Sequence, residues 1–384
     1  MHMSNSIRYV GAMDHEIDLF EGQYAVPQGV SYNSYLILDE KVAVMDTVDA
    51  AKTGDWLENL NRELGDRIPD YLVISHLEPD HSGSIKILAE KYPDMTLVMT
   101  DRAKAMLPQF FDHIPSVIQT VKEGDTLSLG SHTLHFVLAP MVHWPEVMVS
   151  YEESEKALFS ADAFGTFGPV DGSQEWLPEA RRYFINIVGK YGAQVQALLK
   201  KAAGLDIRMI CPLHGPVLKD NLGFYLDKYQ AWSSYAPEEK GVVVAYATFH
   251  GNTGKAARQV AQMLKDAGEE NVVVYDLARD DMAAALADAF RYDRLVLAST
   301  TYDGNFHLKM EDFLLHLKAK SYQKRKVALI ENGSWAPQAI KRMRAYFEGM
   351  ANIQVCEKSV TIKTTVKPET VDAMKEMVSE LMAE

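Results

Sequence analysis

Short apolar runs alternate with longer segments of helical periodicity along the first half of the chain. The pattern predicts strands at 35–38, 41–47, 71–75, 96–100, 132–139, 147–152 and 157–162. It predicts helices near 51–64, 84–91 and 101–110, and a longer helical stretch over about 177–203. Strands mixed with helices in this way are typical of helices layered on sheets, so we expect an α/β domain over residues 1–239.

A stricter alternation begins near residue 240, after the polar segment SSYAPEEKG. The pattern predicts strands at 242–247, 272–277, 295–300, 326–331 and 353–357. Each of them is followed by a predicted helix, near 253–267, 281–289, 309–319, 336–349 and 368–383. Five β–α units of this length predict a doubly wound parallel sheet, so residues 240–384 are expected to form a second domain.

The composition narrows the classes of partner and compartment. The 384 residues carry a formal net charge of −14, so we expect no general attraction to nucleic acid or to anionic lipid. Two cysteines cannot form a four-cysteine iron or iron–sulfur site within one chain, and they suit a reducing compartment. The N-terminus lacks the apolar core of a secretory signal, and no apolar run is long enough to span a bilayer. We therefore expect a soluble, cytoplasmic protein with no membrane partner.

Polar side chains with metal-binding chemistry follow several predicted strands. The segment YLVISHLEPDHSG places His76, Glu78, Asp80 and His81 directly after a buried-looking strand. Four such ligands within six residues can reach two adjacent metals, but rarely one. Three further candidates, also at strand ends, are His143, Asp162 and His214. Any one of these residues could be an ordinary polar loop residue that is satisfied by hydrogen bonds. That interpretation does not explain why all of them recur at strand ends.

The order H-x-E-x-D-H, then His, Asp and His, resembles the flavodiiron branch of the metallo-β-lactamase superfamily. The resemblance implies an N-terminal metallo-β-lactamase-like αββα sandwich, followed by a C-terminal flavodoxin-like doubly wound parallel sheet. It also implies the ligands of two iron ions. His76, Glu78 and His143 would bind one iron, Asp80, His81 and His214 would bind the other, and Asp162 would bridge them.

The ligand chemistry also favours iron. Hydrolases of this superfamily carry a histidine where this chain has Glu78, so an anionic oxygen replaces a neutral imidazole. The set then holds four imidazoles and three carboxylates and no thiolate, which suits non-haem iron. Zinc could also occupy such a site, because the order of metal affinities does not favour Fe(II).

A loop rich in hydroxyl groups and glycine opens the second domain. It contains Thr248, His250, Gly251, Asn252 and Thr253 and leads into a predicted helix, whose N-terminus is suited to a phosphate group. The loop fits neither G-x-G-x-x-G nor G-x-x-x-x-G-K-[ST], so a dinucleotide or ATP is not favoured. It resembles the flavodoxin loop T-x-T-G-x-T, with His250 in place of the middle threonine.

Two later loops lie at the same carboxyl edge of the predicted sheet, where doubly wound folds bind ligands. By resemblance they would hold the isoalloxazine ring of FMN. One loop supplies Thr300, Thr301, Tyr302, Asp303, Gly304 and Asn305. The other supplies Asn332, Gly333, Ser334 and Trp335. We expect Trp335 and Tyr302 to stack on or shield the ring.

The two sites together imply an oxidoreductase. The resemblance implies reduction of dioxygen to water, of nitric oxide to nitrous oxide, or of both, with electrons relayed through FMN from an external donor such as rubredoxin. It also implies a head-to-tail homodimer or a homotetramer. Two alternatives remain open at this point: a di-zinc hydrolase with a regulatory flavodoxin domain, and a flavin electron carrier that is not an enzyme.

Overall fold

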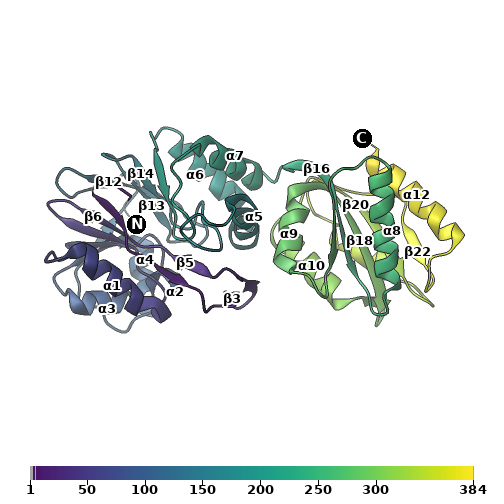
Figure 1. Ribbon diagram of the computed structural model, residues 1–384, viewed down its shortest axis with the longest axis horizontal. Coiled ribbons are helices and arrows are strands. Elements are labelled where there is room, and N and C mark those ends of the chain that lie inside the picture. The colour runs from purple at the N-terminus through teal and green to yellow at the C-terminus, as the bar shows by residue number, and fades with distance from the viewer. Residues whose placement is uncertain (1–2, 5, 384) are drawn as a thin grey trace. The chain divides into compact units, whose positions relative to one another are not determined.

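Two mixed sheets form the centre of the N-terminal unit, Met1–Gln230, in the computed structural model, which describes residues 3–4 and 6–383 (Figure 1). The six-stranded sheet has the order β1 (Ile7–Tyr9), β6 (Tyr35–Leu38), β7 (Val42–Met45), β8 (Tyr71–Val73), β9 (Thr96–Thr100) and β10 (Ile118–Val121). The five-stranded sheet has the order β11 (Thr126–Ser128), β12 (Thr133–Leu138), β13 (Met148–Glu152), β14 (Ala157–Phe159) and β15 (Met209–Cys211).

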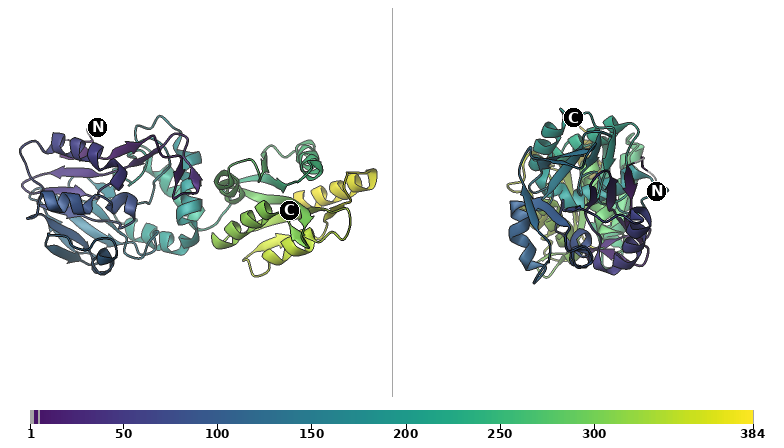
Figure 2. Two further views of the ribbon diagram at one scale, coloured as in Figure 1. Left: turned by 90° about the horizontal axis from the view of Figure 1, so that it is seen from below. Right: turned by 90° about the vertical axis from the view of Figure 1, so that its left-hand side faces the viewer.

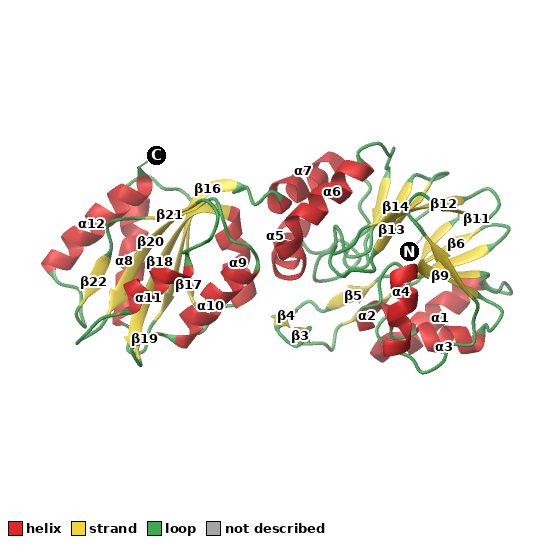
Figure 3. Cartoon of the chain, turned by 180° about the vertical axis from the view of Figure 1, so that it is seen from behind, coloured by secondary structure: helices red, strands yellow, loops and turns green. Residues whose placement is uncertain are grey.

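Helices cover the outer faces of both sheets, which makes the four-layered αββα arrangement expected from the resemblance (Figure 3). On the six-stranded side lie α1 (Thr53–Leu64), α3 (Ile85–Lys91) and α4 (Asp101–Met106). On the five-stranded side lie α5 (Trp176–Tyr183), α6 (Gly192–Ala202) and α7 (Leu222–Ser233). The sheets pack on each other through alternate residues, such as Ile37, Met45 and Val98 from one sheet and Phe136 and Phe159 from the other. Burial of these apolar side chains is the main stabilising contribution to the unit.

Several elements of this unit were not predicted. The N-terminal strands hold two or three residues each, too few to show a period of two: β1, β2 (Ala12–Asp14), β3 (Leu19–Phe20), β4 (Tyr24–Ala25) and β5 (Val30–Tyr32). The sequence also did not reveal β10, β11 or α7. The long helix expected over 177–203 is interrupted, because a π-helical turn (Phe184–Val188) and a 3₁₀ turn (Gly189–Tyr191) separate α5 from α6.

A parallel sheet forms the second unit, Ala231–Glu384. Its strand order is β17 (Val272–Asp276), β16 (Glu239–Ala247), β18 (Tyr292–Tyr302), β20 (Arg325–Asn332) and β21 (Ile353–Val355). This 2-1-3-4-5 order is that of flavodoxin-like folds and confirms the predicted doubly wound sheet. The sequence predicts the domain boundary at 239/240, and the structure divides at Gln230, inside α7.

Helices cover both faces of this sheet (Figure 2). One face is packed against α8 (Asn252–Asp266) and α12 (Pro368–Met382), and the other against α9 (Met282–Arg291), α10 (Leu308–Ala319) and α11 (Ala339–Tyr346). The strand residues are buried from both sides, which is why runs such as VVVAYA are continuously apolar. The predicted last strand, 353–357, is followed by a second one, β22 (Val360–Ile362), which pairs with the carboxyl end of β20.

None of the helices in the described part of the chain has the length and apolar character that a membrane crossing would need.

Gly83 is required by a close approach between two backbone segments. It follows the short helix α2 (Pro79–Ser82), and a Cβ atom added there would lie 2.6 Å from the amide nitrogen of Ala50 and 2.7 Å from the carbonyl oxygen of Pro79. Neither backbone atom can move as a side chain could, so we expect Gly83→Ala to lower the free energy of unfolding by about 2 kcal/mol.

The matched control is Gly54→Ala in α1, where the added methyl group meets open space. Alanine is the better helix former, so we expect this change to raise the free energy of unfolding by about 0.5–1 kcal/mol. Urea denaturation of both variants checks the pair, and equal effects would contradict the packing argument.

Candidate functional site

The seven predicted metal-binding side chains come together at one end of the two sheets of the N-terminal unit. The H-x-E-x-D-H segment begins after β8 and includes α2, whose first residue is Pro79. The other three side chains lie on loops of the five-stranded sheet: His143 between β12 and β13, Asp162 after β14 and His214 after β15. Six of the seven side chains, including that of Asp162, are buried, and the seventh, Glu78, is partly exposed.

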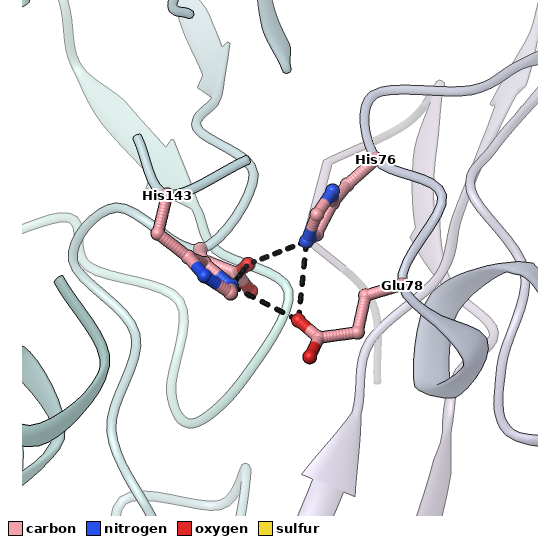
Figure 4. Close-up of side chains that lie close together, drawn as sticks. His76, Glu78 and His143 are labelled. Atoms are coloured by element: carbon pink, nitrogen blue, oxygen red, sulfur yellow. Dashed lines mark hydrogen bonds and ion pairs between the residues drawn. The ribbon is translucent and has the colours of Figure 1, made fainter. Parts of the chain in front are cut away.

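The first group consists of His76, Glu78, His143 and one oxygen of Asp162, whose nearest ligand atoms all lie within 4.8 Å of one another (Figure 4). The Nε2 atom of His143 lies 2.9 Å from Oε2 of Glu78 and 3.1 Å from Oδ2 of Asp162. The Nε2 atom of His76 lies 3.2 Å from Oε2 of Glu78 and 3.4 Å from Oδ2 of Asp162. The four atoms therefore face a common point.

The second group consists of Asp80, His81 and His214. Oδ2 of Asp80 lies 3.3 Å from Nε2 of His81 and 3.2 Å from Nε2 of His214. The other oxygen of Asp162, Oδ1, lies 3.2 Å from Nε2 of His81 and 3.6 Å from Nε2 of His214. The two oxygens of Asp162 thus face different groups, which is the arrangement of a bridging carboxylate.

The atoms of both groups fit metal ions. Ligand atoms held about 2.0–2.2 Å from one ion lie roughly 3.0–3.6 Å from each other, which is the spacing found here. Among the described residues, neither oxygen of Asp162 or of Asp80 has a hydrogen-bond partner, and the same holds for Nε2 of His81, His143 and His214. Buried polar atoms without partners are costly, and two cations would satisfy them.

Hydrogen bonds on the far side of the imidazole rings orient two of the histidines. Nδ1 of His76 lies 2.8 Å from Oε1 of the buried Glu146, and Nδ1 of His214 lies 2.8 Å from the carbonyl oxygen of Ser31. A ring that donates from Nδ1 presents an unprotonated Nε2 to a metal. Asp46 holds the start of the loop in place, because its carboxylate accepts a hydrogen bond from the amide of Ser75 at 2.6 Å.

Protons compete with metal ions for this site, which gives a pH dependence. Burial alone would lower the pKa of His143, but the facing carboxylates of Asp162 and Glu78 outweigh it and raise that pKa to about 9 in the metal-free protein. A metal binds only the unprotonated imidazole, so below this pH it must displace a proton. We expect the affinity of the metal-free protein for Fe²⁺ to rise as the pH increases towards about 9. Anaerobic chelator competition at several pH values measures it, and an affinity that stays constant would contradict the expectation.

An aromatic wall around His214 was not predicted. The rings of Phe20, Tyr32 and Tyr183 have centroids 5.3, 6.0 and 5.5 Å from the ring of His214. On the other side of the centre, Trp144 lies edge-on to His76 at 5.1 Å. The wall comes from segments far apart in the sequence, so no local pattern could reveal it. It excludes water from one side of the centre.

A pocket of ≈870 Å³ lies at the carboxyl edge of the sheet in the second unit. Most of the residues predicted to bind a flavin line it: Thr248, His250, Asn252, Thr253, Thr300, Thr301, Tyr302, Asp303, Gly304, Asn332, Gly333, Ser334 and Trp335. Its volume is within the usual range for small-molecule sites. The side chain of Trp335 is 82% exposed and that of Tyr302 is 44% exposed. Large aromatic rings left open at the rim of a pocket suit a planar ligand that would cover them.

Two predicted flavin-binding residues lie beside the pocket rather than in its wall. Gly251 caps α8 with φ 85° and donates its amide to the hydroxyl of Thr248, so it shapes the phosphate loop. Asn305 pairs with Tyr302 in the turn between β18 and β19 (Asn305–Phe306). Four residues that line the pocket were not predicted: Phe249, Ala336, Gln338 and Thr364. Thr364 follows β22, the strand that the sequence did not reveal.

Comparison with known proteins indicates the family of this chain. The family described as "ODP family beta lactamase" matches residues 30–215, which include all seven candidate metal ligands. The chain is 30% identical over 381 residues to a protein of Vibrio vulnificus named anaerobic nitric oxide reductase flavorubredoxin. That match covers 96% of this chain and 76% of the relative.

Solved structures match over nearly the whole length. The rubredoxin oxygen:oxidoreductase of Desulfovibrio gigas is 26% identical, with a TM-score of 0.93 over 99% of this chain and 97% of that one. The flavodiiron protein of Giardia intestinalis shares the fold at 24% identity, with a TM-score of 0.92 over 99% of this chain and 96% of that one. The names of the relatives from Vibrio vulnificus and Desulfovibrio gigas state an activity, and both are oxidoreductases. By this likeness through both units, the chain belongs to the flavodiiron protein family.

Proposed function

We propose that this flavodiiron protein reduces dioxygen to water, nitric oxide to nitrous oxide, or both, at a centre of two iron ions. Electrons would reach the centre through FMN. The observation that carries the proposal is the position of Asp162, whose two oxygens face two separate groups of histidines and carboxylates. Such a carboxylate suits two adjacent metals and has no comparable role in a site for one.

The donor set supports iron over zinc. His76, Glu78 and His143 would hold one ion and Asp80, His81 and His214 the other, with Asp162 between them. Three carboxylates bring three negative charges into a buried site, which stabilises the higher charge of oxidised iron. When bound, the two ions would supply electrons and an open coordination position for the gas.

The chain's own residues would keep this centre in shape. Glu146 and the carbonyl of Ser31 fix the orientation of His76 and His214, so that their Nε2 atoms stay directed inward. The rings of Phe20, Tyr32 and Tyr183 keep water from one side of the centre. A dry, preorganised site limits side reactions of a reactive gas.

The pocket of the second unit supports the FMN part of the proposal. The N-terminus of α8, with Thr248, Asn252 and Thr253 around it, would receive the phosphate group. The exposed rings of Trp335 and Tyr302 would cover the isoalloxazine. When bound, FMN would pass electrons onward one or two at a time.

The electron donor and the oligomeric state are further parts of the proposal. A separate rubredoxin-type protein would supply electrons; the structural neighbour from Desulfovibrio gigas is a rubredoxin oxygen:oxidoreductase, which supports this choice. The active form would be a head-to-tail homodimer or a homotetramer, in a cytoplasmic setting. Light scattering of the active fraction tests the assembly, and a monomer with full activity would contradict it.

Metal and flavin content, measured together on protein purified without oxygen, tests the proposed function. We expect about two iron ions and about one FMN per chain, and consumption of dioxygen or nitric oxide when reduced rubredoxin is added. Two zinc ions in protein made with ample iron would instead favour the hydrolase. Flavin without metal, in protein that fails to bind added iron, would favour the electron carrier.

A further inference from the structure

A narrow apolar cavity lies between the outer face of the five-stranded sheet and helices α6 and α7. Its volume is ≈20 Å³, which leaves room for about one small molecule. The sheet contributes Leu158 and the cross-strand partners Val137 and Val149. The helices contribute Leu198 and other apolar residues. The cavity belongs entirely to the N-terminal unit.

The lining exposes no polar surface to the cavity. Of its fourteen residues, all within the described part of the chain, only Ser160 and Tyr229 carry a polar side-chain atom. The hydroxyl of Ser160 donates to the carbonyl oxygen of Ala163 at 2.6 Å, and the hydroxyl of Tyr229 accepts a hydrogen bond from the amide of Phe164. Apolar cavities of this kind stay dry and bind apolar atoms such as xenon.

The loop that carries Asp162 forms part of the cavity wall. Ser160, Ala163 and Phe164 of this loop line the cavity, and Phe164 stacks on Tyr229 with ring centroids 4.1 Å apart. Ala163 is the next residue after Asp162. The cavity wall therefore includes the direct sequence neighbour of the residue whose carboxylate both groups of candidate ligands share.

The outer end of the cavity adjoins a more open pocket of ≈330 Å³ on the same side of the unit. Five residues line both: Leu199, Ala202, Leu205, Ile207 and Leu226. Ala202, the last residue of α6, is half-buried where the two spaces meet. The next residue, Ala203, is exposed and lines only the outer pocket. Together the two spaces run from the surface to the Asp162 loop, and the side chains they share are all apolar.

We propose that this cavity is a binding site for a small apolar gas, and that dioxygen or nitric oxide passes through it from the surface to the candidate metal centre. The passage to the metals rests on the proposed function, but the binding of gas does not. Diatomic gases are poorly solvated by water and partition into dry apolar space, whereas ions and polar molecules are excluded from it. The site thus raises the local concentration of the gas beside Asp162.

Xenon tests the site without turnover. Crystals of the whole protein pressurised with xenon are expected to show an ordered atom among Val149, Leu198 and Phe164. No xenon at this position would overturn the proposal. The same crystals decide the cavity even if the protein reduces neither gas, an outcome that would contradict the proposed function alone.

A matched pair of variants tests the passage. Phenylalanine in Ala202→Phe would fill the junction, whereas Ala197→Phe changes an exposed position of the same helix that lines neither space. We expect Ala202→Phe to lower kcat/KM for the gas by about tenfold, with kcat at saturating gas, iron content and FMN content unchanged. Ala197→Phe should stay within about twofold of the parent. If Ala202→Phe keeps the parent's kcat/KM, the gas does not take this route.

Discussion

The Asp162→Asn variant is expected to fold but to lose both metal ions and at least about a thousandfold of the gas-reducing activity. Asparagine has the shape of aspartate, so the packing of the completely buried side chain is kept. The change removes the one negative charge that faces both groups of candidate ligands. An amide group also places an N–H where an imidazole Nε2 must remain available to a metal.

The Glu78→Gln variant is the matched comparison, because it makes the same chemical change within one group only. Glu78 contacts His76 and His143 but none of the second group's residues at ion-pair distance. We therefore expect Glu78→Gln to lose about one metal ion per chain and Asp162→Asn to lose about two. Metal analysis after gel filtration, with circular dichroism to check the fold, measures both.

Two outcomes would contradict the bridging role of Asp162. One is an Asp162→Asn protein that still holds two metal ions. The other is equal metal loss in the two variants, which would mean that Asp162 serves one group only. The distinction matters because the bridge is the feature that requires two adjacent metals.

The architecture of the second unit could be predicted well because each strand is buried on both faces. Runs such as VVVAYA and LVLAST are then continuously apolar, and each is followed by a helix with one apolar face. The prediction missed only two short strands of this unit: β22 has three residues and β19 has two, so neither produces a recognisable apolar run. The unpredicted pocket residue Thr364 follows from this omission, because it lies just after β22.

The first unit was predicted less completely because several of its strands are only two or three residues long. The segment 12–32 forms two small hairpin-like pairings, β2 with β5 and β3 with β4. Their position is set by contacts with residues far along the chain, such as the hydrogen bonds from Asn33 to the carbonyl oxygens of Pro212 and Gly215. A single sequence does not show which distant segments meet.

The candidate metal site could be predicted from residue type and position because its side chains have unusual chemistry and all follow strands. Their grouping around Asp162 in space agrees with the division that the resemblance implies, and their role as iron ligands stays a prediction. The aromatic residues that surround the site could not be predicted in this way. Phe20, Tyr32 and Tyr183 are ordinary core aromatics in the sequence, and only the fold brings them to His214.

The Asn252→Asp variant is expected to lose at least about a hundredfold in affinity for FMN while the flavin-free protein keeps or gains stability. Asn252 is the first residue of α8 and lines the flavin pocket. Aspartate there interacts favourably with the helix dipole, which contributes about 0.3–1 kcal/mol. A phosphate group bound at the same helix end would be repelled, because two negative charges about 5 Å apart cost roughly 3 kcal/mol near a protein surface.

In Asn252→Asp the affinity for FMN thus falls while the stability of the flavin-free protein is kept or rises. A misfolded variant would lose both, so the two measurements distinguish charge repulsion from misfolding. The Asn252→Ala variant removes the amide without adding charge, so we expect its affinity to fall by about tenfold or less. Quenching of FMN fluorescence on titration with flavin-free protein gives the affinities, and thermal unfolding gives the stabilities. If Asn252→Asp binds FMN as tightly as Asn252→Ala, the phosphate does not lie at the N-terminus of α8, and the pocket holds its ligand in another orientation.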